Sequence, residues 1–306
     1  MKYDIVVLGS INMDVIVESP KYPNYGETLF CDAISMTPGG KGANQAVTVA
    51  RLGKKISLIG AVGKDNAGNQ LLKNLQSQGV DTTNVLEITE KGSGTFVAIV
   101  DETGENTMVG TKGANDYITE EDVKKAFENI ESTILLLQME TSKESIIAAM
   151  KIAKERGMFV ILDPAPAGGI FEEAFQYADL ILPNQQETEK ITGIKVTDEK
   201  TALEAAKKIN SLGIENVIVK MGAQGSLVYQ NGESTLVDSI KVDAVDTVGA
   251  GDCYAGAIAC EFLDSNNLVQ AAKFASVAAS IKVSRTGGHN SIPTLIEMKE
   301  YEEQVK

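Results

Sequence analysis

The chain has 306 residues, of which 43% are hydrophobic and 23% charged, and its formal net charge is −14. This length is enough for one large α/β domain. The negative charge disfavours binding to a phosphate backbone or to an anionic membrane surface, so we expect neither nucleic acid nor a membrane as a partner.

Short apolar runs alternate with amphipathic helical segments along the chain. Continuous apolar runs are typical of strands buried on both faces, and they lie at residues 5–9, 56–63, 134–138, 159–163, 180–184 and 217–222. Helical patterns span residues 119–130, which open with Thr119 and Asp122 at capping-box spacing, 142–157 and 201–213. This order predicts an α/β fold, a three-layer α/β/α arrangement with a mainly parallel central sheet and helices on both faces.

Two regions depart from this pattern. Residues 14–37 and 94–112 alternate in polarity and contain no helical signal. We expect them to form a small antiparallel sheet, inserted as a lid into a single domain of residues 1–306. The exposed edge and face of such a sheet favour a homodimer through the lids.

Polar and glycine residues follow the predicted strands. Asn12 and Asp14 follow the first strand, Glu140 follows the run at 134–138, and Asn184 and Glu187 follow the run at 180–184. The stretch MGAQG follows Lys220, and a later run at 239–245 precedes DTVGAGD. Because ligands of such sheets bind beyond the carboxyl ends of the strands, these residues predict a site at one edge.

The stretch DTVGAGD, residues 246–252, places a carboxylate beside a glycine turn at the start of a helical segment. The first turn of a helix has unpaired N–H groups, and Gly249, Ala250 and Gly251 have little bulk to keep an anion away. This predicts an anion hole for a phosphoryl group, with Asp252 as the base that accepts a proton from a hydroxyl. The alternative is that Asp252 only caps the helix.

A second glycine cluster lies in PGGKGANQAVTVARLG, residues 38–53, at the start of a helix of small residues. Gly39, Gly40 and Gly42 allow a close approach to the backbone, while Lys41 and Asn44 supply hydrogen-bond donors. The cluster favours ligand binding, with a plain glycine-rich turn as the alternative.

These stretches together resemble the ribokinase-like (phosphofructokinase B) carbohydrate kinase family. The matching motifs are GSINMD, GGKGANQA, GAVGKDNAG, LDPAPA, LPNQQE, KMGAQG and DTVGAGD, which occur in this order over nearly the whole chain. The resemblance implies transfer of the ATP γ-phosphoryl group to the 5-hydroxyl of D-ribose. Asp252 would be the general base, and the backbone amides of Gly249, Ala250 and Gly251 would stabilise charge on the transferred group.

The resemblance also implies the ligand contacts. The sugar would be held by Asn12, Met13, Asp14, Gly40, Lys41, Gly42, Ala43, Asn44, Glu140 and Asp252. ATP would contact Asn184, Lys220, Met221, Gly222, Ala223, Gln224, Gly225, Gly251, Asp252 and Ser276.

The same resemblance implies two metal ions. Glu187 would hold Mg²⁺ through water, and it carries this role nearly alone because Gln185 stands where the family commonly has a glutamate. A potassium ion would be bound, largely through backbone carbonyls, by Asp246, Val248, Lys282, Arg285, Gly287 and Ser291. His289, the only histidine, lies in the same loop, where we expect a surface or loop role.

Other interpretations remain open at this stage. The acceptor could be 2-deoxyribose, fructose, another hexose derivative or a nucleoside. A nicotinamide-dependent oxidoreductase is disfavoured because no GxGxxG follows the first strand, and a non-catalytic sugar sensor would have no use for Asp252. The three cysteines lack metal-site spacing and the N-terminus lacks a signal-peptide pattern, so we expect a cytoplasmic protein.

Overall fold

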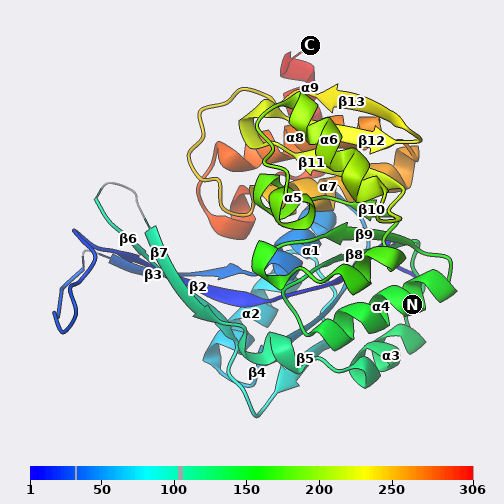
Figure 1. Ribbon diagram of the computed structural model, residues 1–306. Helices are drawn as coiled ribbons and strands as arrows, with labels where there is room; N and C mark the ends of the chain where they lie inside the picture. The colour runs from blue at the N-terminus through cyan, green and yellow to red at the C-terminus, as the bar shows by residue number, and fades with distance from the viewer. Residues whose placement is uncertain (32, 103–105, 306) are drawn as a thin grey trace.

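The computed structural model describes residues 1–31, 33–102 and 106–305. A nine-stranded sheet with the order β13-β12-β11-β10-β9-β8-β1-β4-β5 runs through it, and helices lie on both sides of this sheet (Figure 1). Its strands are β1 (Ile5–Leu8), β4 (Ile56–Gly63), β5 (Val85–Ile88), β8 (Ile134–Gln138), β9 (Phe159–Asp163), β10 (Leu180–Ile181), β11 (Asn216–Lys220), β12 (Ser226–Gln230) and β13 (Glu233–Val237).

The predicted fold class is confirmed. Every neighbouring pair from β5 to β11 is parallel, and β12 and β13 add an antiparallel edge. Successive residues of β1 belong to two separate apolar clusters, with Ile5 and Val7 in one and Val6 and Leu8 in the other. Burial on both faces is the reason why this strand reads as an unbroken apolar run.

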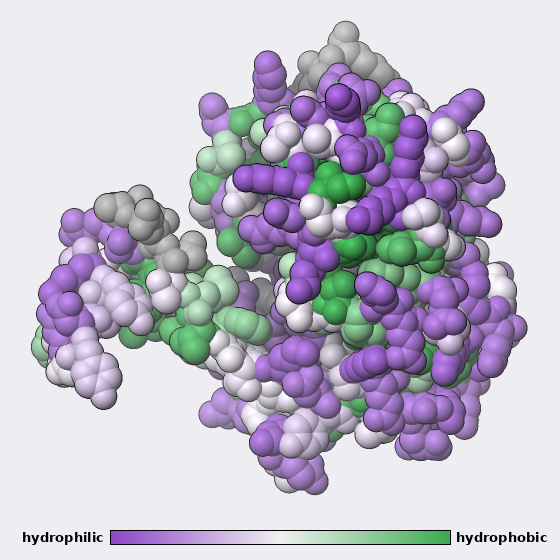
Figure 2. Space-filling model, in the orientation of Figure 1, coloured by the Kyte–Doolittle hydropathy of each residue, from purple (hydrophilic) through white to green (hydrophobic). Residues whose placement is uncertain are grey.

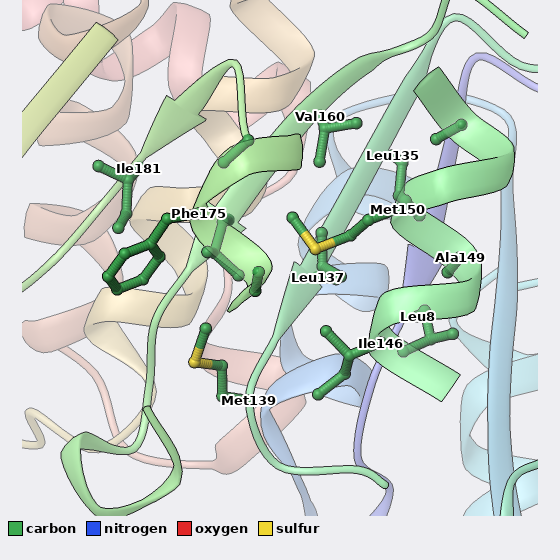
Figure 3. Packing of buried hydrophobic residues seen from close by; sticks show 14 of the residues in the cluster. Leu8, Leu135, Leu137, Met139, Ile146, Ala149, Met150, Val160, Phe175 and Ile181 are labelled. Carbon is green, nitrogen blue, oxygen red and sulfur yellow. The ribbon is translucent and has the colours of Figure 1, made fainter. Parts of the chain in front are cut away.

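Helices cover the two faces of the sheet. One face packs against α3 (Glu120–Glu128), α4 (Lys143–Glu155), α5 (Gln185–Thr192) and α6 (Glu199–Asn210). The other packs against α1 (Lys41–Arg51), α2 (Asn66–Ser77), α7 (Ala250–Ser265), α8 (Leu268–Val283) and α9 (Leu295–Val305). Figure 3 shows Ile146 and Met150 of α4 lying beside Leu135 and Leu137 of β8. Among the described residues, no helix is long and apolar enough to cross a membrane.

The predicted helices correspond to α3, α4 and α6, and the capping box of Thr119 and Asp122 is present at the start of α3. Five short 3₁₀ helices lie in the connections between these elements in the described residues: η1 (Gly113–Tyr117), η2 (Ala167–Gly169), η3 (Glu172–Tyr177), η4 (Gly222–Gln224) and η5 (Gly288–Ser291).

A second, four-stranded sheet projects from the main body (Figure 1). Its order is β3-β2-β6-β7, formed by β2 (Asn12–Glu18), β3 (Ala33–Gly39), β6 (Gly94–Val100) and β7 (Asn106–Thr111). The sheet was predicted to be antiparallel. The β2–β3 and β6–β7 pairs are antiparallel, but the central β2–β6 pair is parallel. Two hairpins, β2–β3 and β6–β7, lie side by side, and the first strand of each runs outward in the same direction.

Two strand predictions need correction, and one hairpin was missed. The run at 180–184 forms a strand only at Leu180–Ile181, and the run at 239–245 is not a strand. The hairpin of β12 and β13 was missed although Asn231 and Gly232 form its turn, both with positive φ (52° and 81°). An Asn-Gly pair between alternating strands is a strong hairpin signal.

We predict that Gly256→Ala destabilises the fold by about 1–3 kcal/mol, the usual cost of an extra methyl group in a packed core. A Cβ at Gly256 in α7 would lie 2.7 Å from the Cβ of Thr48 and 3.0 Å from the carbonyl oxygen of Gln45, both in α1. Urea unfolding measures the change. The matched control is Gly168→Ala, where a Cβ meets no described atom within 4 Å; equal stabilities of the two variants would contradict the prediction.

Candidate active site

The carboxyl ends of the central strands meet the N-termini of α1 and α7 at one edge of the larger sheet. Contacts join residues that are far apart in the sequence: Ser10 with Glu140, and Asn44 with Asp252. The polar residues that follow the predicted strands are therefore brought together there, as expected for a parallel sheet.

The N-terminus of α7 is open to an anion. Gly249 is the N-cap with a left-handed φ of 74°, a conformation that glycine adopts without strain. The first-turn N–H groups of a helix have no helical acceptor and lie at the positive end of its dipole. A Cβ at Gly251 would lie 3.7 Å from Lys220 Nζ, so a lysine ammonium faces the same point.

Asp252 lies beside this helix end and is only 6% exposed. Its Oδ2 accepts a hydrogen bond from Asn44 Nδ2 at 2.8 Å. Burial raises the pKa of Asp252, and the charge of Lys41 opposes that rise. In turn Asp252, more than any other group, raises the pKa of Lys41. Because Gly249 is the N-cap and Asp252 bonds to another helix, the structure does not support the capping alternative for this carboxylate.

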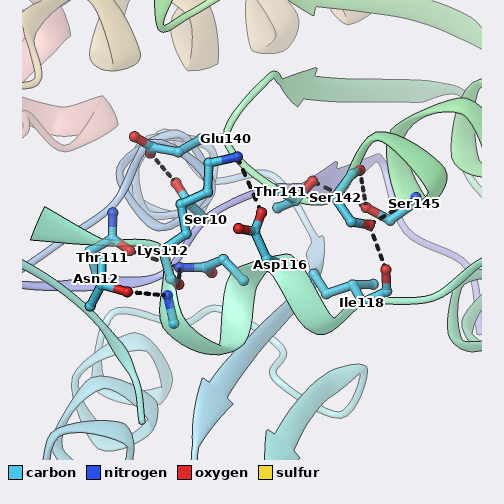
Figure 4. A network of polar contacts seen from close by, with 12 residues as sticks. Ser10, Asn12, Thr111, Lys112, Asp116, Ile118, Glu140, Thr141, Ser142 and Ser145 are labelled. Carbon is cyan, nitrogen blue, oxygen red and sulfur yellow. Dashed lines mark hydrogen bonds and ion pairs between the residues drawn. The ribbon is translucent and has the colours of Figure 1, made fainter. Parts of the chain in front are cut away.

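A polar cluster lies at the base of the second sheet. Glu140 is buried, and its Oε2 accepts a hydrogen bond from Ser10 Oγ at 2.5 Å (Figure 4). Asn12 is also buried, and its Oδ1 accepts from Asn115 Nδ2 at 2.8 Å. Asp14 is half-buried, and this burial, followed by the charges of Glu140 and Asp252, raises its pKa to about 6.

The glycines of the second cluster allow this crowding. A Cβ at Gly39 would lie 2.1 Å from Asp14 Oδ2, and one at Gly40 would lie 2.6 Å from the carbonyl oxygen of Ser10. Gly40 also has a φ of 94°. Side chains at these positions would displace Asp14 or the end of β1, which explains the GGKG pattern in physical terms.

A cavity of about 490 Å³ opens on the other side of the α7 N-terminus. It is lined by Lys220, Gly222, Ala223, Gly225, Gly251 and Ser276, all predicted nucleotide contacts, and by apolar residues of 240–244, α7 and α8. The run at 239–245 that looked like a strand is thus a wall of this cavity.

Asn184 and Glu187 form a capping box at the start of α5. Glu187 Oε2 accepts from Asn184 N at 2.7 Å, and Asn184 Oδ1 accepts from Glu187 N at 2.8 Å. Glu187 is buried, which raises its pKa, while the charge of Lys220 opposes the rise. The carboxylate therefore belongs to the electrostatic environment of the site.

Some predicted contact residues do not point into the site. The side chains of Met13 and Ala43 lie in the apolar cluster beneath α1, and Met221 lies in the opposite cluster. Gln224 does not line the cavity. The side chains of Met13, Ala43 and Met221 therefore pack in the core, whereas that of Gln224 is exposed to solvent.

A family model described as "pfkB family carbohydrate kinase" matches residues 2–295. The chain belongs to this family. It is 36% identical over 302 residues to a ribokinase of Haemophilus influenzae, covering 98% of this chain and 99% of that protein. It is 34% identical over 302 residues to a deoxyribokinase of Salmonella typhimurium, covering 97% and 98%. Its fold is similar to that of Arabidopsis thaliana ribokinase complexed with ribose and ATP, with a TM-score of 0.90, 29% identity and 98% of both chains covered.

The family motifs contain one buried carboxylate that the sequence analysis did not assign. Asp163, from LDPAPA, is 1% exposed and ends β9. Its Oδ1 accepts from Lys220 Nζ at 2.8 Å, and its Oδ2 accepts from Gln45 Nε2 at 2.9 Å. Asp163 therefore orients the lysine that lies near Gly251 at the N-terminus of α7. Its position at the carboxyl end of a predicted strand was the signal for it.

His289 lies in η5, in the loop between α8 and α9, as one part of the expectation had it, but it is only 3% exposed and so is not at the surface. Burial, and then the charge of Arg51, lowers its pKa to about 4, so the ring is neutral at pH 7. Its Nε2 lies 3.1 Å from Asn44 Oδ1, while Asn44 Nδ2 donates to Asp252. Because the Asp252 carboxylate only accepts, Asn44 turns its oxygen to His289, and the proton belongs on Nε2. Nδ1 then accepts, so the side-chain amide of Asn74, 2.6 Å away, must present its nitrogen to the ring. His289 thus orients Asn44.

The potassium ligands implied by the resemblance lie between the end of α8 and the turn before α7. Lys282 Nζ is 3.0 Å from Asp246 Oδ2, and Arg285 pairs with Glu297 at 2.6 Å. An ammonium group thus already contacts the carboxylate that a potassium ion would use. This residue set does not fit a bound monovalent cation, and we use no such ion in the chemistry below.

We predict that Asn44→Leu raises the pKa of Asp252 further, because the hydrogen bond from Asn44 stabilises only the charged carboxylate. Carboxyl ¹³C NMR of protein labelled at aspartate measures this titration. Asn69→Leu, at an exposed position of α2, is the control. An unchanged or lowered pKa in Asn44→Leu would show that Asn44 does not stabilise the Asp252 charge.

Proposed function

We propose that this pfkB-family chain is an ATP-dependent ribokinase that phosphorylates the 5-hydroxyl of D-ribose. The observation that supports it most is the position of Asp252. This buried carboxylate lies beside the open N-terminus of α7, with the polar cluster of Asp14 and Glu140 on one side and the 490 Å³ cavity on the other. Transfer of a phosphoryl group to a sugar hydroxyl needs a base that lies between the bound sugar and the groups that stabilise the phosphoryl charge.

The sugar is assigned to the polar cluster. Vicinal hydroxyl groups are donors, and a carboxylate such as that of Asp14 accepts two of them. Asn12 and Glu140 are held by Asn115 and Ser10, so their orientation is fixed before the sugar arrives. Such preorganisation lowers the entropic cost of placing the acceptor hydroxyl.

The nucleotide is assigned to the cavity, with its apolar walls around the adenine ring and Lys220 beside the phosphates. Mg²⁺ would be held by Glu187 through water, together with the phosphates. No cluster of three or more potential metal ligands occurs among the described residues, which suits an ion that usually takes one or two carboxylates plus phosphates. When bound, Mg²⁺ neutralises charge on the phosphate oxygens.

The chain's own groups then carry the transfer. Asp252 accepts the proton of the sugar 5-hydroxyl as the hydroxyl oxygen forms a bond to the γ-phosphorus. The bond from that phosphorus to the bridging oxygen breaks, and ADP leaves. The N–H groups at the start of α7 and the ammonium of Lys220 stabilise the charge on the transferred group. Burial raises the pKa of Asp252, and the charge of Lys41 opposes that rise by favouring the ionised carboxylate.

One relative supports a second candidate acceptor, 2-deoxyribose, because a deoxyribokinase is 34% identical over nearly the full chain. The two sugars differ by a single hydroxyl group. A site built to bind that hydroxyl would reject the deoxy sugar strongly, so comparing the two acceptors decides between them.

We also propose that residues 1–306 form one domain whose second sheet is a lid that closes on the sugar. Exposed apolar side chains gather on this sheet, namely Ile34 and Met36 of β3 and Met108 and Val109 of β7 (Figure 2). A homodimer through the lids would cover them. We place the protein in the cytoplasm, where ATP is available.

A coupled assay of ADP formation with ribose, 2-deoxyribose, fructose and adenosine tests the function. We expect the highest kcat/KM with ribose. Asp252→Asn should cut kcat by about 10²–10⁴-fold because the general base is lost, while calorimetry should find sugar affinity within a few-fold of wild type. Asp264→Asn, on the surface, is the control. Near-normal turnover in Asp252→Asn would reject its role as the base.

We predict that kcat/KM for ribose falls as the pH drops below about 6. Asp14 has its pKa raised to about 6, so it becomes protonated there and loses its capacity to accept two hydroxyl hydrogen bonds. A pH–rate profile from pH 5 to 8 measures this. Asp116→Asn, at an exposed position near the lid base, should leave the profile unchanged. A flat profile down to pH 5 would remove Asp14 from sugar binding.

A further inference from the structure

A buried lysine fixes the loop that leads into the anion hole. Lys282 Nζ lies 3.0 Å from Asp246 Oδ2 and 3.0 Å from the Asp246 carbonyl oxygen. Lys282 is only 2% exposed. A charge removed from water to this degree must be paired and hydrogen-bonded, and Asp246 provides both.

Asp246 transmits this constraint toward α7. Its Oδ1 accepts a hydrogen bond from Val248 N at 3.0 Å. Val245 N and Asp246 N both donate to the carbonyl oxygen of Val283, at 2.7 and 3.1 Å. Gly249, the N-cap of α7, is the next residue after Val248. The positive charge of Lys282, paired with Asp246, therefore holds the turn that sets the position of the α7 N-terminus.

The end of α8 favours a cation at this place. Lys282 belongs to the last turn of α8, where carbonyl groups lack helical donors and the dipole is negative. The carboxylate of Asp246 adds a full negative charge. The site therefore attracts one positive charge, and Lys282 already supplies it from within the chain.

A potassium ion would have to compete with Lys282 for the same oxygens. Both contacts of Lys282 Nζ are to Asp246. The carbonyl oxygen of Lys282 accepts from Arg285 N at 3.3 Å, and that of Gly287 accepts from Asn290 N at 3.0 Å. An ion beside Asp246 would also face the ammonium group at close range, and two positive charges repel.

We propose that Lys282 is a built-in substitute for the monovalent cation, so that this enzyme works without potassium. An ammonium group has the same charge as a potassium ion and a similar size, so it can neutralise Asp246 and order residues 246–249 in the same way. Lys282 is a positioning residue in this account and does not touch the substrate. The consequence for turnover rests on the proposed function, whereas the cation site itself does not.

Thermal unfolding in potassium chloride and in tetramethylammonium chloride at equal ionic strength tests the site without any activity. We expect the same Tm in both salts for the wild type. Lys282→Ala removes the ammonium group and leaves space beside Asp246. The Tm of this variant should be lower than that of the wild type and should rise in potassium chloride but not in tetramethylammonium chloride. Lys282→Met fills the space without charge and should show no potassium response. Lys54→Ala, which breaks a surface ion pair, is the control.

Turnover provides the second readout. Wild-type ADP formation with ribose should be equal in the two salts, whereas Lys282→Ala should lose about 10²-fold in kcat without potassium, the cost of a misplaced anion hole, and should regain it with potassium. A potassium-specific rise in the Tm or the turnover of the wild type would overturn the proposal, even if Lys282→Ala does not fold. Absence of sugar-dependent turnover in both salts, with the Tm pattern intact, would reject the proposed function and leave the cation site standing.

Discussion

A carboxylate buried as deeply as that of Asp252 is stable only when nearby groups replace its lost hydration. Lys41 supplies an opposite charge, and Asn44 supplies a hydrogen bond. Both belong to the first turn of α1, so α1 and α7 must meet at a fixed distance and angle. Gly256 of α7 allows this close approach, because any side chain there would collide with Thr48. The packing of two helices is thus tied to the ionisation of one group.

The same constraint organises the surroundings of Asp252. Asp163 and Lys220 lie at the carboxyl ends of strands β9 and β11 of the central sheet. Lys220 Nζ is 2.8 Å from Asp163 Oδ1, and this ion pair lies near the N-terminus of α7. The second sheet starts at the same edge and contributes Asp14. Each of the two lysines interacts with carboxylates of the site: Lys220 pairs with Asp163, and the charge of Asp252 acts on Lys41. This arrangement keeps a strongly acidic protein able to attract the phosphates of a nucleotide at one place on its surface.

The sequence predicted the features that depend on local patterns. The buried strands appear in the sequence as apolar runs. The glycine clusters indicate places where another backbone segment or a ligand approaches the main chain closely. Long-range pairing has no such local trace: nothing near His289 indicates that it contacts Asn44, 245 residues away. The pattern at 239–245 wrongly predicts a strand, because apolar residues that line a cavity give the same pattern as apolar residues in a sheet. The role of Lys282 was missed because a ligand set that uses backbone carbonyls does not specify side chains.

The central claim is that Asp252 and the α7 N-terminus together direct the γ-phosphoryl group to the 5-hydroxyl of a bound pentose. Phosphorus-31 NMR of a reaction with ATP, Mg²⁺ and ribose, run beside one with 5-deoxyribose, tests it most directly. We predict a sugar 5-phosphate signal with ribose and no sugar phosphate with 5-deoxyribose, which lacks the acceptor. A phosphorylated product from 5-deoxyribose, or release of inorganic phosphate alone with both sugars, would contradict the claim.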